Sequence, residues 1–72
     1  MNNKMMNDVR PIFSIVWGDG HIMHRVGKVG IEKIGVYEEP AEMGVVLWFA
    51  IWVQGQIIQR IPARIIEEVN YV

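Results

Sequence analysis

The ten residues Gly44–Val53, GVVLWFAIWV, contain no charge and are rich in β-branched and aromatic side chains. A membrane-spanning helix needs roughly 20 apolar residues, whereas this length and composition are typical of a long strand. Side chains alternate between the two faces of a strand, so the odd-numbered residues share one face, and Trp48 and Trp52 share the other with the small Ala50 between them. Both faces are apolar. One layer of structure in so short a chain cannot cover both, and we therefore expect a partner surface.

The size of the chain points to the same need. Seventy-two residues make one domain, and a domain this small is usually stabilised by disulfides, a metal or oligomerisation. The chain has no cysteine and only two histidines, while 51% of its residues are hydrophobic. We therefore expect a single small domain over residues 10–72 that forms a homo-oligomer.

The charge balance argues against general nucleic-acid binding. The formal net charge is −1 and the sequence pI about 6.0, and the basic residues are scattered, whereas a phosphate-binding surface needs a basic stripe. The opening, MNNKMMNDVR, has no apolar segment typical of a secretory signal. We expect residues 1–9 to be a disordered polar leader, and the protein to be cytoplasmic without membrane contact.

Glycine and proline divide the rest of the chain into short segments with strand composition. We predict strands over Pro11–Trp17, His21–Val26, Ile31–Tyr37, Gly44–Val53 and Ile57–Ile61.

The connections between these strands are also readable. Gly18-Asp19-Gly20 predicts a tight turn because Asp-Gly supplies positive φ angles, and Glu38–Gly44 predicts a polar connection containing a proline. The pattern of Ile65–Val72 fits either a strand or a helix. We favour one helical turn at Pro62–Ile65 followed by a closing strand.

These segments predict an all-β fold: a small five- to six-stranded barrel, or a strongly curled antiparallel sheet, with one short helical turn near Pro62. The segment Arg60–Ile65, RIPARI, with the strand after it resembles the end of a Src-homology-three-like small barrel, in which a helical turn opened by Ile-Pro precedes the last strand. The resemblance covers the C-terminal third of the chain. The family's acidic-aromatic motif and adjacent Trp pair are absent, and Ile65 stands where peptide-binding members carry tyrosine. The resemblance therefore does not imply binding of proline-rich peptides.

The strongest candidate site is the Trp-bearing face. The Cα atoms of Trp48 and Trp52 would lie roughly 13 Å apart at the rise of a strand, as two aromatic walls with a shallow floor. A planar ligand could stack there, although Trp is also enriched at the centre of protein interfaces. We favour the interface, with Trp17 and Tyr37 as further aromatic anchors.

Three arginines are candidates for the rim of this site. Arg60 and Arg64 flank Pro62, and Arg25 comes from another predicted strand. Arginines that converge near the Trp face could hold a phosphate or carboxylate through paired hydrogen bonds. The alternative is that they are exposed or form weak surface ion pairs with acidic side chains.

No constellation predicts catalysis, a cofactor or a metal. Asp19, His21 and His24 lie close in sequence, but the two histidines point to opposite faces of a strand, and the ligand count of a zinc site is not met. Asp19 is explained by its turn. Ser14 has no histidine at a readable spacing. The segment Gly27–Gly30 lacks the full phosphate-loop pattern.

We therefore predict a non-enzymatic interaction module, a homo-oligomeric accessory or inhibitor protein of the kind found in phages, which binds itself and another protein. The alternative is an oligomeric protein that binds a small molecule or nucleotide at a subunit junction. In that case Trp48 or Trp52 would stack on a base and an arginine would hold its phosphate.

Overall fold

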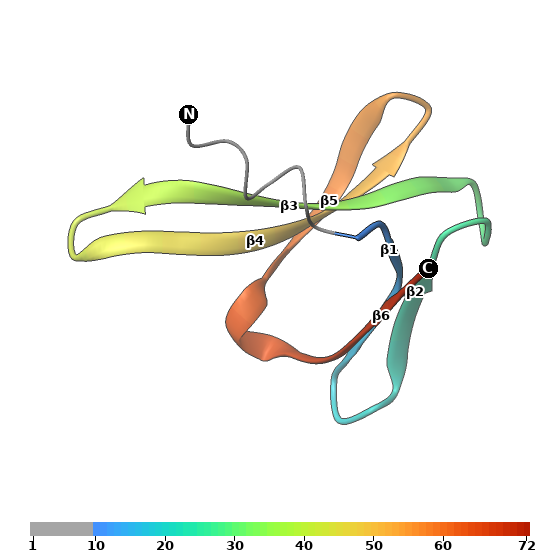
Figure 1. Ribbon diagram of the computed structural model, residues 1–72, viewed down its shortest axis with the longest axis horizontal. Coiled ribbons are helices and arrows are strands. Elements are labelled where there is room, and N and C mark those ends of the chain that lie inside the picture. Colours follow the sequence, from blue (N-terminus) through green and yellow to red (C-terminus); the bar gives the residue numbers. More distant parts are fainter. Residues whose placement is uncertain (1–9) are drawn as a thin grey trace.

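A computed structural model describes residues 10–72 of the chain as six strands and one turn of 3-10 helix (Figure 1). The elements are β1 Ile12–Trp17, β2 Ile22–Arg25, β3 Ile31–Ala41, β4 Gly44–Val53, β5 Gln56–Pro62, η1 Ala63–Ile65 and β6 Ile66–Tyr71. This confirms the all-β prediction and the helical turn next to Pro62. The expected polar leader, residues 1–9, lies outside the described residues.

The strands form two antiparallel three-stranded sheets, in the orders β2-β1-β6 and β3-β4-β5. Within residues 10–72, backbone pairing gives these two sheets and no closed or curled sheet. The chain passes between the two sheets at the turn from β2 to β3 and again through η1, which follows Pro62. Proline cannot donate a ladder hydrogen bond, so it suits the end of a strand.

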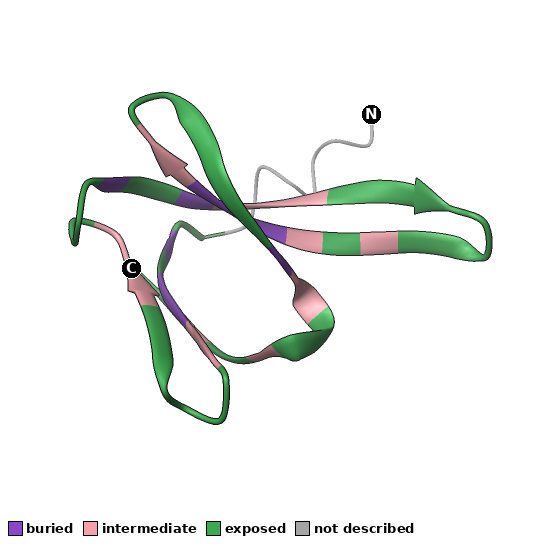
Figure 2. Ribbon diagram, turned by 180° about the vertical axis from the view of Figure 1, so that it is seen from behind, coloured by how far each residue is buried: buried purple, intermediate pink, exposed green. Residues whose placement is uncertain are grey.

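The core lies between the two sheets and takes side chains from both. Ile15 of β1, Ile51 of β4 and Ile61 of β5 are almost fully buried, and Figure 2 shows buried positions both where β3, β4 and β5 cross and along β1. The inward residues of β4 include Phe49 and Ile51, so one face of the apolar strand is covered by the chain's own second sheet.

The hairpin of β3 and β4 is longer than the sequence predicts. The expected polar connection Glu38–Gly44 is wrong, because β3 continues to Ala41 and pairs with β4 as far as Ala41↔Gly44. Pro40 is tolerated there because β3 is an edge strand and no described strand pairs with its outer side. The end of this hairpin projects beyond the other strands in Figure 1.

A β-bulge changes the faces of the first strand. The register of β1 with β6 shifts between Ile12 and Ser14, so that Phe13 is the extra residue and is exposed. Simple alternation would place Phe13 on the same face as Ile15, but the bulge turns it outward. The open question of the C-terminal segment is resolved as strand β6, paired with β1.

Candidate functional site

The outward side of sheet β3-β4-β5, called the outer face below, gathers the predicted aromatic residues. Sheet β2-β1-β6 packs on the opposite side. Backbone register places the outward residues in rows across the strands. From the tip of the hairpin inward, the rows are Glu39 and Val46; Tyr37, Trp48 and Pro62; Gly35, Ala50 and Arg60; Lys33, Trp52 and Ile57.

Each tryptophan on the outer face has a cation above its ring. The guanidinium carbon of Arg60 lies 4.6 Å from the centre of the Trp48 ring, and the ammonium of Lys33 lies 4.7 Å from that of Trp52. A positive charge is attracted to the negative face of an aromatic ring. The apolar stems of these long side chains also cover part of each ring, so both tryptophans are partly buried rather than fully exposed.

Hydrogen bonds fix the orientation of this group. The indole Nε1 of Trp48 donates to the carboxylate of Glu39 at 2.8 Å, and Arg60 Nη1 donates to the hydroxyl of Tyr37 at 2.9 Å. The bond to Tyr37, with a smaller contribution from the charge of Glu39, raises the pKa of Arg60 above its ordinary value. The rings of Trp48 and Tyr37 are thus held by polar partners on other strands of the same sheet.

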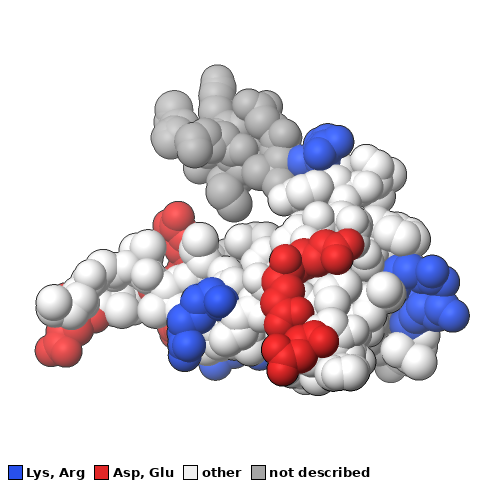
Figure 3. Space-filling model, turned by 90° about the horizontal axis from the view of Figure 1, so that it is seen from below, with Lys and Arg blue, Asp and Glu red and all other residues white. Residues whose placement is uncertain are grey.

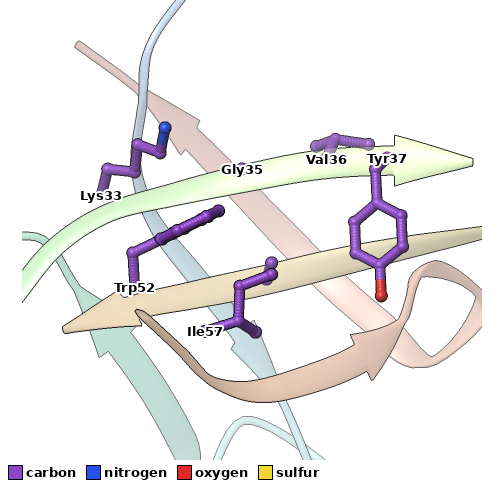
Figure 4. A pocket seen from close by; sticks show the side chains of 7 residues that line it. Lys33, Gly35, Val36, Tyr37, Trp52 and Ile57 are labelled. Atoms are coloured by element: carbon purple, nitrogen blue, oxygen red, sulfur yellow. The ribbon is translucent and has the colours of Figure 1, made fainter. Parts of the chain in front are cut away.

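A hollow of about 290 Å³ lies between Trp52 and Tyr37, and Trp48, which was expected to form one of its walls, does not line it. Its floor is Gly35, which pairs directly with Ala50. Figure 4 shows Trp52 at one end of the hollow, Tyr37 at the other and Ile57 along the β5 side. Glycine and alanine leave this space empty because neither has a side chain beyond Cβ. The lining is mostly apolar, and Lys33 is its one charged residue among those described.

The other predicted site residues lie elsewhere. Trp17 packs against the core from β1 and stacks on His24 with 6.1 Å between ring centres. Arg25 belongs to β2 in the second sheet, where its guanidinium lies 5.7 Å from the ring of Phe13. Arg64 lies in η1. The structure therefore brings together Trp48, Trp52, Tyr37 and Arg60, without Trp17, Arg25 or Arg64.

The acidic residues of β6 have partners other than the arginines. Glu67 accepts a hydrogen bond from the backbone N–H of Asp19 at 2.8 Å, and Glu68 accepts one from the side chain of Asn70 at 3.0 Å. Figure 3 shows an acidic patch lying between two basic ones on the lower side of the molecule.

Two charged residues of the outer face were missed by sequence reasoning, Lys33 and Glu39. Both lie in β3 at the same alternation as Tyr37. Period-two reading of the predicted strand would have found Lys33, whereas Glu39 was assigned to a connection. What the sequence does not reveal is the register that places each of them beside a particular tryptophan.

The two histidines do not form a metal site with Asp19. His21 is exposed in the turn before β2, and His24 is partly buried, which lowers its pKa by desolvation. Within residues 10–72 there is no group of three or more histidine, cysteine or acidic side chains arranged to hold a metal ion.

A comparison with protein-family models, with curated proteins and with solved structures finds no match to this chain. No helix within residues 10–72 is long and apolar enough to span a membrane.

Proposed function

We propose that the protein is a non-enzymatic interaction module whose outer face binds a partner protein. The observation that carries this proposal is the aromatic hollow between Tyr37 and Trp52, beside a second tryptophan held by Arg60 and Glu39. Trp, Tyr and Arg are the residues that most often dominate the energy of protein interfaces. Here they lie on one rigid sheet face, preorganised by hydrogen bonds, which lowers the entropic cost of association.

The shape and charge of the face indicate what the partner presents. A hollow of about 290 Å³ is at the lower limit of small-molecule sites, which span roughly 300–1,000 Å³, and it suits a single inserted side chain. Lys33 and Arg60 disfavour a cationic group there. The partner would insert an apolar or aromatic side chain flanked by acidic residues, as an accessory or inhibitor protein could require of its target.

A second candidate function is binding of a nucleotide-like ligand. The observation in its favour is that Lys33 lines the same hollow as the aromatic walls, so a base could stack while the ammonium meets a phosphate. Arg60 is less available for this role, because it already donates to Tyr37 and stacks on Trp48.

The finer architecture belongs to the same proposal. We infer a small barrel of the Src-homology-three-like kind, supported by the single core shared by the two sheets and by the 3-10 turn before the last strand. In such an arrangement the outer face would be the outside wall formed by β3, β4 and β5.

The test is a comparison of three tagged forms of the full chain: wild type, Trp52→Ala and Ile58→Ala. Ile58 is an exposed apolar residue of β5 outside the hollow, so its variant is the matched control. We expect a partner protein that is retained by wild type and by Ile58→Ala but not by Trp52→Ala. Once purified, this partner should bind wild type and Ile58→Ala more tightly than it binds Trp52→Ala. Retention that is equal for all three forms would contradict the proposal. A titration with adenosine monophosphate addresses the second candidate, since binding lost in both Trp52→Ala and Lys33→Ala would favour it.

A further inference from the structure

The β3–β4 hairpin has a second surface on the side opposite to the outer face. We call the part of the hairpin from Val36 to Phe49 the arm, and this opposite side its inner side. The ladder pairs on the inner side are Val36↔Phe49, Glu38↔Leu47 and Pro40↔Val45. In Figure 2 the arm runs from buried residues at the body to exposed residues at its tip.

The inner side of the arm is apolar where it leaves the body. Phe49 is buried, but Leu47 is 43% exposed and Val45 is 61% exposed. β5 pairs with β4 only as far as Trp48, so beyond that point the arm is a two-stranded ribbon. Such a ribbon is at best marginally stable alone in water. A surface that covered the inner side of the arm would therefore stabilise the folded chain by burying Leu47 and Val45.

A hollow of about 490 Å³ lies at the base of the arm, where its inner side meets the ends of β1 and β6. It is lined mainly by apolar side chains, among them Ile34, Leu47 and Phe49. Among the described residues, Arg10 is the only charged one that lines it, and its guanidinium carbon lies 4.9 Å from the centre of the Tyr71 ring. One liquid water occupies about 30 Å³, so residues 10–72 leave a substantial apolar space here, with a single cation of the described chain at its edge.

We propose that the hollow and the inner side of the arm are covered by a second copy of the chain in a two-fold dimer. The arm of each copy would lie across the hollow of the other, with Val45 and Leu47 against its apolar lining and Glu38 beside the partner's Arg10. This contact is self-complementary, as a two-fold interface requires, because one chain supplies both the arm and the hollow.

The charges at the arm and the hollow favour a second copy of the chain over an apolar partner of another kind. Among the described ladder pairs of the arm's inner side, Glu38 is the only charged residue, and Arg10 is its counterpart at the hollow. A two-fold axis between antiparallel arms creates the Glu38–Arg10 contact twice. Burial of Leu47 and Val45 would also supply the oligomerisation that a cysteine-free 72-residue domain commonly needs.

This inference concerns a different surface from the proposed partner site, so the two can be tested separately. The measurement is sedimentation equilibrium of the full chain from about 1 µM to about 1 mM, combined with native mass spectrometry. We expect a species of twice the 8.3 kDa chain mass with no additional bound mass. The variants are Leu47→Lys, Arg10→Glu, Glu38→Arg and the Arg10→Glu/Glu38→Arg double variant, with Ile58→Lys and Lys28→Glu as exposed controls.

The expected pattern is specific to reciprocal arms. Leu47→Lys gives a monomer that is folded by circular dichroism, because Leu47 is already partly exposed in one chain. Each single charge reversal weakens the dimer about five-fold, the double reversal restores it to within about two-fold, and the controls leave it unchanged.

Three results would overturn the dimer. They are a monomer at all concentrations, a dimer that resists Leu47→Lys, and a double reversal no better than its singles. A dimer lost in Trp52→Ala but kept in Leu47→Lys would place self-association on the outer face instead. If Trp52→Ala loses partner binding and keeps the dimer mass, the result supports the proposed function and agrees with a dimer that does not use the outer face.

Discussion

Arg60 and Tyr37, on the two edge strands of sheet β3-β4-β5, are joined across β4 by a 2.9 Å hydrogen bond from Nη1 to the phenolic oxygen. The intervening strand contributes Trp48, whose ring lies under the guanidinium. The outer face is therefore preordered by a bridge between its own edges. A partner would meet a surface whose rotamers are already restricted.

The first prediction concerns this bridge. In Arg60→Ala the ring of Trp48 loses its cover, so we expect the tryptophan emission of the folded protein to shift to longer wavelength. Tyr37→Phe removes only the hydrogen bond and should shift the emission in the same direction by a smaller amount. Fluorescence spectra of the folded variants measure both. Arg64→Ala, changed in η1, is the control, and an equal shift in that variant would argue against the bridge.

The sequence predicted the parts of this face that follow from alternation within one strand. Trp48 and Trp52 share a side of β4 because no bulge interrupts that strand between them. Tyr37 and Arg60 were named as candidates, but their mutual contact depends on the registers of β3 and β5 with β4. Register is set by long-range pairing that local composition does not encode.

The errors of the sequence reading have identifiable physical causes. Glu38 and Pro40 suggested a connection because charge and proline are rare within central strands, yet both are tolerated on the edge strand β3. Simple alternation places Phe13 on the face of Ile15 and misses the bulge, because a bulge leaves no clear mark in a short apolar segment. Arg25 was separated from the tryptophans by the division into two sheets, which strand lengths alone do not predict.

A second prediction tests the shared core. Ile51 is fully buried between the sheets, and Ile51→Val should lower the free energy of unfolding by about 0.5–1.5 kcal/mol, because it removes one buried methyl group. The same change at Ile58, which is exposed, should stay within about 0.5 kcal/mol of wild type. Urea denaturation of the two variants at equal protein concentration gives the comparison. Equal losses would mean that the core does not lie where the sheets cross.

A third prediction concerns the buried polar contact between β1 and β6. Ser14 is almost fully buried, and its hydroxyl accepts a 3.0 Å hydrogen bond from Asn70 Nδ2. Asn70→Ala should cost about 1–2 kcal/mol of unfolding free energy, because it leaves this hydroxyl without its partner. In a double-mutant cycle with Ser14→Ala, the two losses should be less than additive. Strict additivity would show that the bond contributes nothing.

A fourth prediction addresses strain in the turn between β2 and β3. Val29 has a φ of 44° and is 89% exposed, a conformation that is costly for a β-branched residue. Val29→Asn should raise the free energy of unfolding by about 1 kcal/mol, since asparagine tolerates the left-handed region. Val29→Ala should gain less, because alanine is still disfavoured there. Thermal denaturation ranks wild type, Val29→Asn and Val29→Ala by stability. A Val29→Asn variant less stable than wild type would contradict the assignment of strain.

The last prediction is a pH dependence that arises from His24. Its ring stacks on Trp17, its buried Nε2 has no hydrogen-bond partner among residues 10–72, and desolvation lowers its pKa below the ordinary 6.5. The unfolded chain therefore binds a proton more readily than the folded one. The resulting stability is complete above about pH 6.5 and is lost as the pH falls through the lowered pKa of the folded state. Melting temperatures measured from about pH 7.5 to about pH 5.5, above the range in which most carboxylates titrate, should fall for wild type and for the exposed-site control His21→Gln. The fall should be smaller in His24→Gln, and an unchanged slope in that variant would assign the pH dependence to other groups.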